Sequence, residues 1–396
     1  MQEFGYMGKI LEVDLSHETV RTRPLPALCG GRSLAARLML ETLHGGETAL
    51  SEENVVVITT AVLTLTGAPG SARFDIASLS PRDDRPAIAN CGGSFGMNLR
   101  RAGYDALVLR GRCQGLRCLE IDEDCVRFAD ASPLQGMETD RCSEILSRGK
   151  AGSSVLCIGP AGENTVNFAS VFANGHSTGR AGFGAVLGWK KLKAIRVTGG
   201  KKLPLYDEPR VRELTRSWAA ALREARQESG GYVCRACPLH CERQGRGDDP
   251  RMDALGMDAF AAEKAAARLA DCGLSREALF EAMAYGRVDA NVRGSGEKEN
   301  TLKSGKRRKG SFASVLRAFD LPDDETSEEF CRNFTEAVSV SGQCMFTLKA
   351  LKKGELPMLE LLRAVTGREY TPEDFVALGE ESRALERELK ARFAGG

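Results

Sequence analysis

The sequence predicts an α+β fold, in which a β-rich N-terminal region of two sheets precedes a mostly helical C-terminal region. Up to about residue 200, short runs of β-branched and aliphatic residues alternate with glycine-rich turns, which is typical of strands. From about Leu205, apolar residues recur at helical spacing instead. Because 396 residues exceed one ordinary core, we predict two domains, 1–202 and 203–396.

The predicted strands are short apolar runs that end at glycine pairs or polar turns. They include Lys9–Leu15, Asn54–Thr59, Ala106–Arg110, Leu119–Ile121 and Ala194–Thr198. The most apolar run of the chain, from Val55 to Leu65, is interrupted only by threonines and predicts a buried strand.

Capping residues mark the predicted helices of the second region. The helix starts are Asp207 with Pro209 behind it, Thr326 with Glu329, and Thr371 with Asp374. The helix after Thr371 is expected to run to about Arg392. Alanine-rich runs predict two further helices, Ala259–Leu269 and Glu277–Ala284.

Composition excludes several classes of protein. A net charge of +1 gives no reason to expect nucleic acid or an anionic membrane as the main partner. No run reaches the roughly 18 apolar residues of a membrane helix, and the first residues lack the pattern of a signal peptide, so we expect a cytoplasmic protein. The basic, glycine- and serine-rich segment 294–311 predicts a solvated linker, or alternatively a docking patch for an acidic electron carrier.

The cysteines carry the strongest local signal. The run Cys234-Arg235-Ala236-Cys237-Pro238-Leu239-His240-Cys241 has the spacing C-x2-C-x3-C, which chance does not explain for 13 cysteines in 396 residues. Three thiolates from one tight turn and a fourth from elsewhere suit a [4Fe–4S] cluster. Structural zinc, with His240 or another cysteine as a ligand, is the alternative.

Ordered motifs over about 190 residues resemble the aldehyde ferredoxin oxidoreductase family. The motifs are Gly8–Leu11, Gly30–Leu34, Ala68–Phe74, Asn90–Gly96, Ala102–Ala106, Ile158–Asn164 and Gly179–Gly188. Each is a glycine-rich turn of a common kind, and their order makes the resemblance specific. Leu361–Gly367 and Tyr370–Phe375 also match the C-terminal region of the family.

The resemblance implies a pterin-binding N-terminal domain. Members of the family hold tungsten, or molybdenum, between two pterins whose phosphates are bridged by Mg²⁺. Glycines let backbone N–H groups approach phosphate oxygens closely, and arginine supplies a forked donor. The residues implied to contact the pterins or their Mg²⁺ are Arg73, Asn90, Gly92, Gly179 and Arg180.

Two motifs in the helical region extend this implied site. Asp253-Ala254-Leu255-Gly256-Met257-Asp258 resembles the family's Asp-x-x-Gly-Leu-Asp motif, which implies pterin contacts for Asp253 and Asp258. From the residues alone, Asp258 is a helix N-cap. Ser339-Val340-Ser341-Gly342-Gln343-Cys344 resembles the second motif, Asp-x-x-Gly-x-Cys, which implies Cys344 as fourth cluster ligand. Serine stands there in place of the family's aspartate.

Segments that carry the active-site glutamate and histidine of the family are short here, so no catalytic acid or base is assigned. The resemblance implies an oxidoreductase that oxidises a small aldehyde to a carboxylate. Electrons would pass through the cluster to ferredoxin or another electron-carrier subunit, in an anaerobic cytoplasm and in a homo- or hetero-oligomer. A non-catalytic electron-relay or assembly subunit, with the cluster but no working pterin site, is the alternative.

Overall fold

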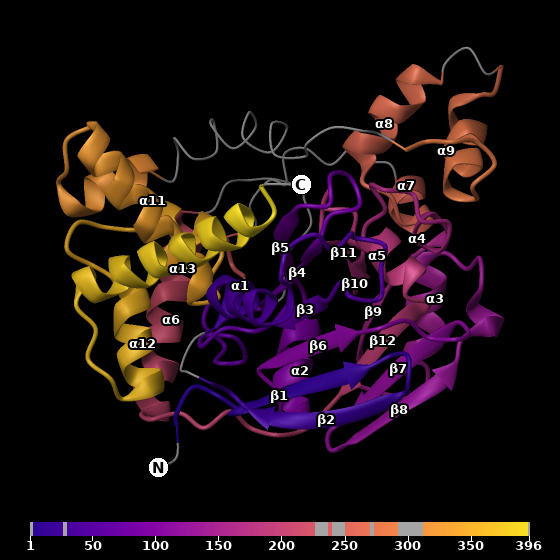
Figure 1. Cartoon of the computed structure of the whole chain (residues 1–396). Helices are drawn as coiled ribbons and strands as arrows, with labels where there is room; N and C mark the ends of the chain where they lie inside the picture. Colours follow the sequence, from indigo (N-terminus) through magenta and orange to yellow (C-terminus); the bar gives the residue numbers. More distant parts are fainter. Residues whose placement is uncertain are drawn as a thin grey trace.

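The computed structural model describes residues 3–26, 30–225, 237–239, 250–269, 273–291 and 312–394. Two mixed sheets form the N-terminal region and helices form most of the rest, which confirms the predicted α+β class (Figure 1). The first sheet consists of β1 (Lys9–Asp14), β2 (Thr19–Pro24), β3 (Val56–Thr59), β4 (Arg73–Leu79), β5 (Pro86–Gly92) and β6 (Ala106–Arg110). The second consists of β7 (Arg117–Asp122), β8 (Cys125–Asp130), β9 (Ser154–Cys157), β10 (Phe172–Ala173), β11 (His176–Ser177) and β12 (Leu192–Thr198).

The second sheet repeats the topology of the first. The strand orders are β2-β1-β6-β3-β4-β5 and, read from the other edge, β8-β7-β12-β9-β10-β11. In each sheet a hairpin (β1–β2 or β7–β8) places its first strand parallel to the last strand, β6 or β12. Every other pairing is antiparallel. The β-rich region therefore consists of two halves, which we call the first half (9–110) and the second half (117–198).

Helices occupy equivalent places in the two halves. In the first half, α1 (Gly31–Thr42) follows the hairpin and α2 (Phe95–Ala102) connects β5 to β6. In the second half, α3 (Thr139–Ser147) follows the hairpin, and α5 (Phe183–Trp189) connects β11 to β12, with α4 (Pro160–Glu163) after β9.

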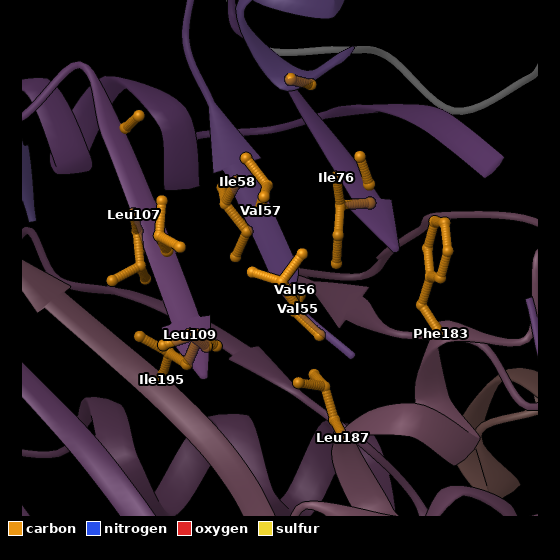
Figure 2. Close-up of a cluster of buried hydrophobic side chains, with 14 of the residues drawn as sticks. Val55, Val56, Val57, Ile58, Ile76, Leu107, Leu109, Phe183, Leu187 and Ile195 are labelled. Atoms are coloured by element: carbon orange, nitrogen blue, oxygen red, sulfur yellow. The ribbon is translucent and has the colours of Figure 1, made fainter. Parts of the chain in front are cut away.

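The core lies between the two sheets. Figure 2 shows Leu107 and Leu109 of β6, with Val55–Ile58 in and before β3, gathered near Ile195 of β12 and Leu187 of α5. All of these side chains are at most 1% exposed. Burial at about 25 cal/mol per Å² of apolar surface makes this shared core the main force that holds the halves together.

The C-terminal helices divide into two groups, one over each half (Figure 1). The first group packs beside α1 and contains α11 (Glu325–Val340), α12 (Pro357–Thr366) and α13 (Pro372–Arg392), with α6 (Glu208–Glu224) against α12. The second group packs beside α3 and α4 and contains α7 (Pro250–Leu255), α8 (Ala259–Arg268) and α9 (Arg276–Ala284). Leu389 and Phe393 at the end of the chain join the core of the sheets. The boundary at residue 202 stays a prediction; it falls between β12 and α6.

The predicted strands are present, and one predicted extent is wrong. The apolar run from Val55 to Leu65 gives strand only over β3, and the chain turns after Thr59. The Oγ1 of Thr64 accepts a hydrogen bond from the Ala61 N–H, and Leu65 adopts a φ of +73°. A threonine side chain that satisfies the local backbone favours a turn over continued strand pairing.

The predicted helices are also present, with one corrected start. Asp207 and Thr371 cap α6 and α13 as expected, the latter in a full capping box with Asp374. The expected start at Thr326 is wrong, because the Asp324 carboxylate accepts the Ser327 N–H at 2.8 Å and starts α11 two residues earlier. Aspartate is among the strongest N-caps, so it prevails over the threonine pattern.

Segment 294–311, predicted as a basic linker, lies outside the described residues. Within the part of the chain that is described, no helix combines the length and low polarity that a bilayer crossing requires.

Candidate cofactor site

The first half carries a hydrogen-bonded trio at the β4–β5 pair. The Nε of Arg73 donates to Oδ1 of Asn90, and Nδ2 of Asn90 donates to Oδ1 of Asp75 at 2.9 Å. The register explains this trio, since Asp75 pairs with Asn90 and Arg73 pairs with Gly92. The sequence-predicted residues Arg73, Asn90 and Gly92 therefore lie together.

Asp75 is a buried charge, with 2% of its surface exposed. Burial raises the pKa of its carboxyl group to about 6, against the opposing effects of the Arg32 guanidinium and the Asn90 hydrogen bond. Arg32 itself is held by Glu336 of α11 at 3.1 Å and Glu386 of α13 at 2.7 Å. These ion pairs attach the first group of C-terminal helices to α1.

The second half places Gly179 and Arg180 directly before α5. The Oγ of Ser170 donates to the carbonyl of Gly179 at 2.7 Å, and no atom lies within 4 Å of the place where a Cβ on Gly179 would stand. The Arg180 guanidinium lies 3.4 Å from the Asp258 carboxylate and 4.3 Å from the centre of the Phe260 ring. Asp258 also caps α8, as its position in the sequence predicts.

The two glycine-rich turns lie next to each other. The Cys91 thiol is 3.5 Å from the carbonyl oxygen of His176 and 3.6 Å from that of Ser177. A Cβ on Gly93 would stand 3.1 Å from the His176 ring. The edge of the first sheet at β5 therefore meets the edge of the second at β11, which brings the predicted residues Asn90 and Gly92 near Gly179 and Arg180.

The two helical motifs form equivalent turns. The N–H of Gly256 bonds to the carbonyl of Asp253 at 3.1 Å, and the N–H of Gly342 bonds to that of Ser339 at 3.0 Å. The φ values are +81° and +93°, which favour glycine at the end of a helix. Asp253 and Ser339 therefore occupy matching positions at the ends of α7 and α11.

The residues after these turns dock on the two halves in matching ways. The N–H of Asp258 bonds to the carbonyl of Phe168 at 3.3 Å, in the second half. The N–H of Cys344 bonds to the carbonyl of Gly70 at 3.0 Å, in the first half. A line of contacts therefore runs from Cys344 through Gly70 and the Arg73 trio, across the β5–β11 edge, to Arg180 and Asp258.

The cluster cysteines are described in part. Cys234 and Cys241, with His240, lie outside the described residues. Cys237 is half-buried and packs against an apolar cluster that also contains Phe346 and Leu348, a few residues after Cys344. The four-cysteine ligand set stays a prediction.

Two residues of this site were missed by sequence reasoning. Asp75 is the only charged residue in the buried run Phe74–Leu79 of β4, and a charge in a buried strand was the available signal. Arg32 lies within a quoted glycine motif, but its buried ion pairs depend on helices some 300 residues further along the chain.

The site suits an anionic cofactor. Arg180 is 15% exposed, and its guanidinium donates no hydrogen bond to another residue in the described ranges. The open space at Gly179 allows an oxygen to approach the backbone beside this guanidinium. Phosphate-bearing pterins fit such a donor set.

Fold and site together define a two-sheet cofactor-binding protein with paired glycine-rich cradles. Residues 10–199 match the family described as aldehyde ferredoxin oxidoreductase, N-terminal domain. These residues, just under half of the chain, therefore form a domain of the aldehyde ferredoxin oxidoreductase family, as the motifs predicted, and the family is one of oxidoreductases.

Curated relatives match somewhat more than half of this chain. A tungsten-containing aldehyde ferredoxin oxidoreductase from Thermococcus kodakarensis is 37% identical over 237 residues, 58% of this chain and 39% of the relative. The "aliphatic sulfonate oxidoreductase, WOR-like subunit" of Pyrococcus furiosus is 31% identical over 261 residues, 58% of this chain and 41% of that subunit. The matched region thus covers about two fifths of these relatives.

A solved structure extends the likeness of fold to the whole chain. It is the active site complex BamBC of benzoyl coenzyme A reductase, with a TM-score of 0.79 and 19% identity. The match covers 99% of this chain and 90% of that one. At this identity the likeness concerns the fold alone.

Proposed function

We propose that the chain is an iron–sulfur oxidoreductase that binds a tungsten or molybdenum bis-pterin and oxidises an aldehyde to a carboxylate. Cys234, Cys237, Cys241 and Cys344 would hold a [4Fe–4S] cluster, which would supply electron transfer to ferredoxin or another carrier subunit. The supporting observation is the line of contacts from Cys344 to Asp258, which joins two equivalent cradles.

Each cradle has a chemical task in this proposal. Arg73 and Arg180 bind the pterin phosphates, and the glycine backbones at 92 and 179 allow close approach. Asp253 and Asp258 accept hydrogen bonds from pterin N–H groups. When bound, the metal centre supplies the two-electron oxidation of the substrate. An Mg²⁺ ion, which would neutralise phosphate charge, belongs to the same proposal.

The cluster is proposed to lie beside the first cradle. Cys344 is anchored by its N–H to Gly70, at the start of the loop that leads to Arg73. The apolar packing of Cys237 near Phe346 is compatible with cysteines 234–241 approaching Cys344. Electrons from the pterin site would then have a short route to the surface.

An electron-relay or assembly subunit is the second candidate, and Ser339 favours it. The Oγ of Ser339 bonds back to the carbonyl of Thr335 at 3.3 Å, so this position offers no carboxylate to a second pterin. Such a subunit would keep the cluster without a working pterin site.

Metal analysis of anaerobically purified protein tests both candidates. About four irons per chain with about one tungsten or molybdenum supports the enzyme. The same iron content without either metal supports the relay. Zinc in place of iron contradicts both.

A further inference from the structure

The first cradle contains a carboxylate that the family motifs do not assign. Asp75 lies on β4 two residues after Arg73, and its Oδ1 accepts the Asn90 Nδ2–H at 2.9 Å. Its other oxygen, Oδ2, receives no hydrogen bond from any described residue. Although the residue is only 2% exposed, Oδ2 is not among the fully enclosed atoms that lack a partner, so it keeps a small accessible surface at which a ligand donor can reach it.

The neighbouring cations do not satisfy this oxygen. Arg32 directs its guanidinium to Glu336 and Glu386 instead, at 3.1 and 2.7 Å. The Nε of Arg73 donates to Asn90. The hydrogen-bond network therefore leaves Oδ2 as an acceptor that a ligand donor can complete.

Asp75 also lies near the position where the family motif has its aspartate. A Cβ on Gly31 would stand 3.3 Å from Oδ2 of Asp75, 3.3 Å from the Ser339 carbonyl oxygen and 3.0 Å from that of Val340. Only the bare backbone of Gly31 separates the Asp75 carboxylate from the end of α11. In the second half, the residue that matches Ser339 is Asp253, which is a carboxylate.

We propose that Asp75 is the carboxylate of the first cradle: its Oδ2 accepts a hydrogen bond from a pterin ring N–H, the task that Ser339 cannot perform. This inference rests on the proposed function. The carboxylate that the family motif has at the position of Ser339 is then supplied by Asp75. The first pterin is then held by β4 of the sheet, and the second by the end of α7.

The test compares pterin and metal content per folded chain in anaerobically purified variants, with the melting temperature measured beside it. Asp75→Asn keeps the shape and keeps an acceptor for Asn90, but it presents an N–H to the pterin N–H. We expect about tenfold less bound pterin at limiting pterin supply. Asp84→Asn is the matched control, because the Asp84 carboxylate accepts the Ala49 N–H at 2.7 Å in a purely structural contact. It should keep the wild-type pterin content.

A second substitution separates pterin binding from folding. Ser339→Asp in the Asp75→Asn background returns one carboxylate to the cradle, so pterin content should recover to at least about half of the wild-type value. Ser339→Asp alone adds a carboxylate beside Asp75 and Glu336, and should lower the melting temperature. Pterin content is counted per folded chain in every variant, so a lower yield of folded Asp75→Asn protein does not count as a loss of binding.

The outcomes distinguish the two proposals. Wild-type protein without pterin, tungsten or molybdenum contradicts the proposed function itself. Wild-type protein that is loaded, together with an equally loaded Asp75→Asn, overturns only the role of Asp75. A double variant that folds without regaining pterin also overturns it.

Discussion

The first and second halves share a strand order but differ in how charge is arranged around their cradles. In the first half, Arg73, Asn90 and Asp75 form a trio within one sheet. The last residue of the helical motif that docks on this half is Cys344, which carries a thiol. In the second half, Arg180 pairs with Asp258, which caps α8, a C-terminal helix that is not part of either sheet. The two halves thus share a strand order, but a thiol stands in the first where a carboxylate stands in the second.

The C-terminal helices reinforce this difference. Arg32 joins α1 to α11 and α13 through ion pairs whose side chains are 18–22% exposed. Its counterpart in the second half is Arg251, which joins α7 to Glu138 and Glu281 at 29–45% exposure. The ion pairs that attach the C-terminal helices to the first half are therefore more buried, and those that attach them to the second half are more exposed to water, which screens them.

The largest expected effect concerns the thiol that distinguishes the first half. Cys344→Ser removes the proposed fourth cluster ligand, and iron should fall from about four per chain toward zero, with loss of the visible absorption. Cys331→Ser is the control, because Cys331 is fully buried in α11 and should leave the iron content unchanged. An intact cluster spectrum in Cys344→Ser would show that this ligand is wrong.

The next effect compares the two guanidinium groups. Arg73→Ala and Arg180→Ala each remove charge-assisted hydrogen bonds of about 1.5–3 kcal/mol, so bound pterin should fall roughly 10- to 100-fold in both. Arg127→Ala removes an exposed arginine that pairs with Glu120 and serves as the control. A loss in only one of the two variants would mean that a single cradle binds pterin.

The ion pairs of Arg32 and Arg251 should differ in their effect on stability. Arg32→Ala leaves Glu336 and Glu386 as unpaired, mostly buried charges, so the free energy of unfolding should fall by about 3 kcal/mol. Arg251→Ala should cost less than about 1 kcal/mol, because its partners are partly exposed. Urea unfolding of both variants measures the difference, and equal losses would contradict the contrast between buried and screened ion pairs.

The last prediction is a pH dependence of stability that comes from Asp75 in the first half. The pKa of Asp75 is about 6 in the folded protein against an ordinary value of 3.8, because burial disfavours the charge. The folded state therefore binds the proton more tightly, and Asp75 lowers stability as pH rises from about 4 to about 6, by up to about 3 kcal/mol. Asp75→Asn should remove this slope in unfolding measured from pH 4 to 7. An unchanged slope would assign it to other groups.

Local features of this fold could be predicted from sequence, whereas its symmetry could not. β-branched runs gave the strands, and caps such as Asp207 and Thr371 gave helix starts, because both depend on neighbours within a few residues. The repeated strand order depends on pairings such as β1 with β6, whose partners are 96 residues apart, and single-sequence periodicity carries no information on them.

The candidate site shows the same division. Glycine motifs located Arg73, Asn90, Gly179 and Arg180, since they lie in turns with a recognisable pattern. Asp75 was missed, because its importance comes from burial and from Gly31, which lies on another element. Cys344 was predicted as a ligand from the resemblance alone. Its backbone hydrogen bond to Gly70, which is 274 residues earlier in the chain, could not be predicted from the sequence.

Helix α13 caps the C-terminal end of helix α1. Arg392 donates from Nη1 to the carbonyls of Leu40 and Leu43 at 2.7 and 2.6 Å, at the C-terminal end of α1. These contacts span about 350 residues, so they form only after the ribosome has released α13, long after both sheets have emerged. The carbonyl groups at the end of α1 therefore lack these donors until α13 docks, which makes the docking of α13 a late step in the folding of the first half.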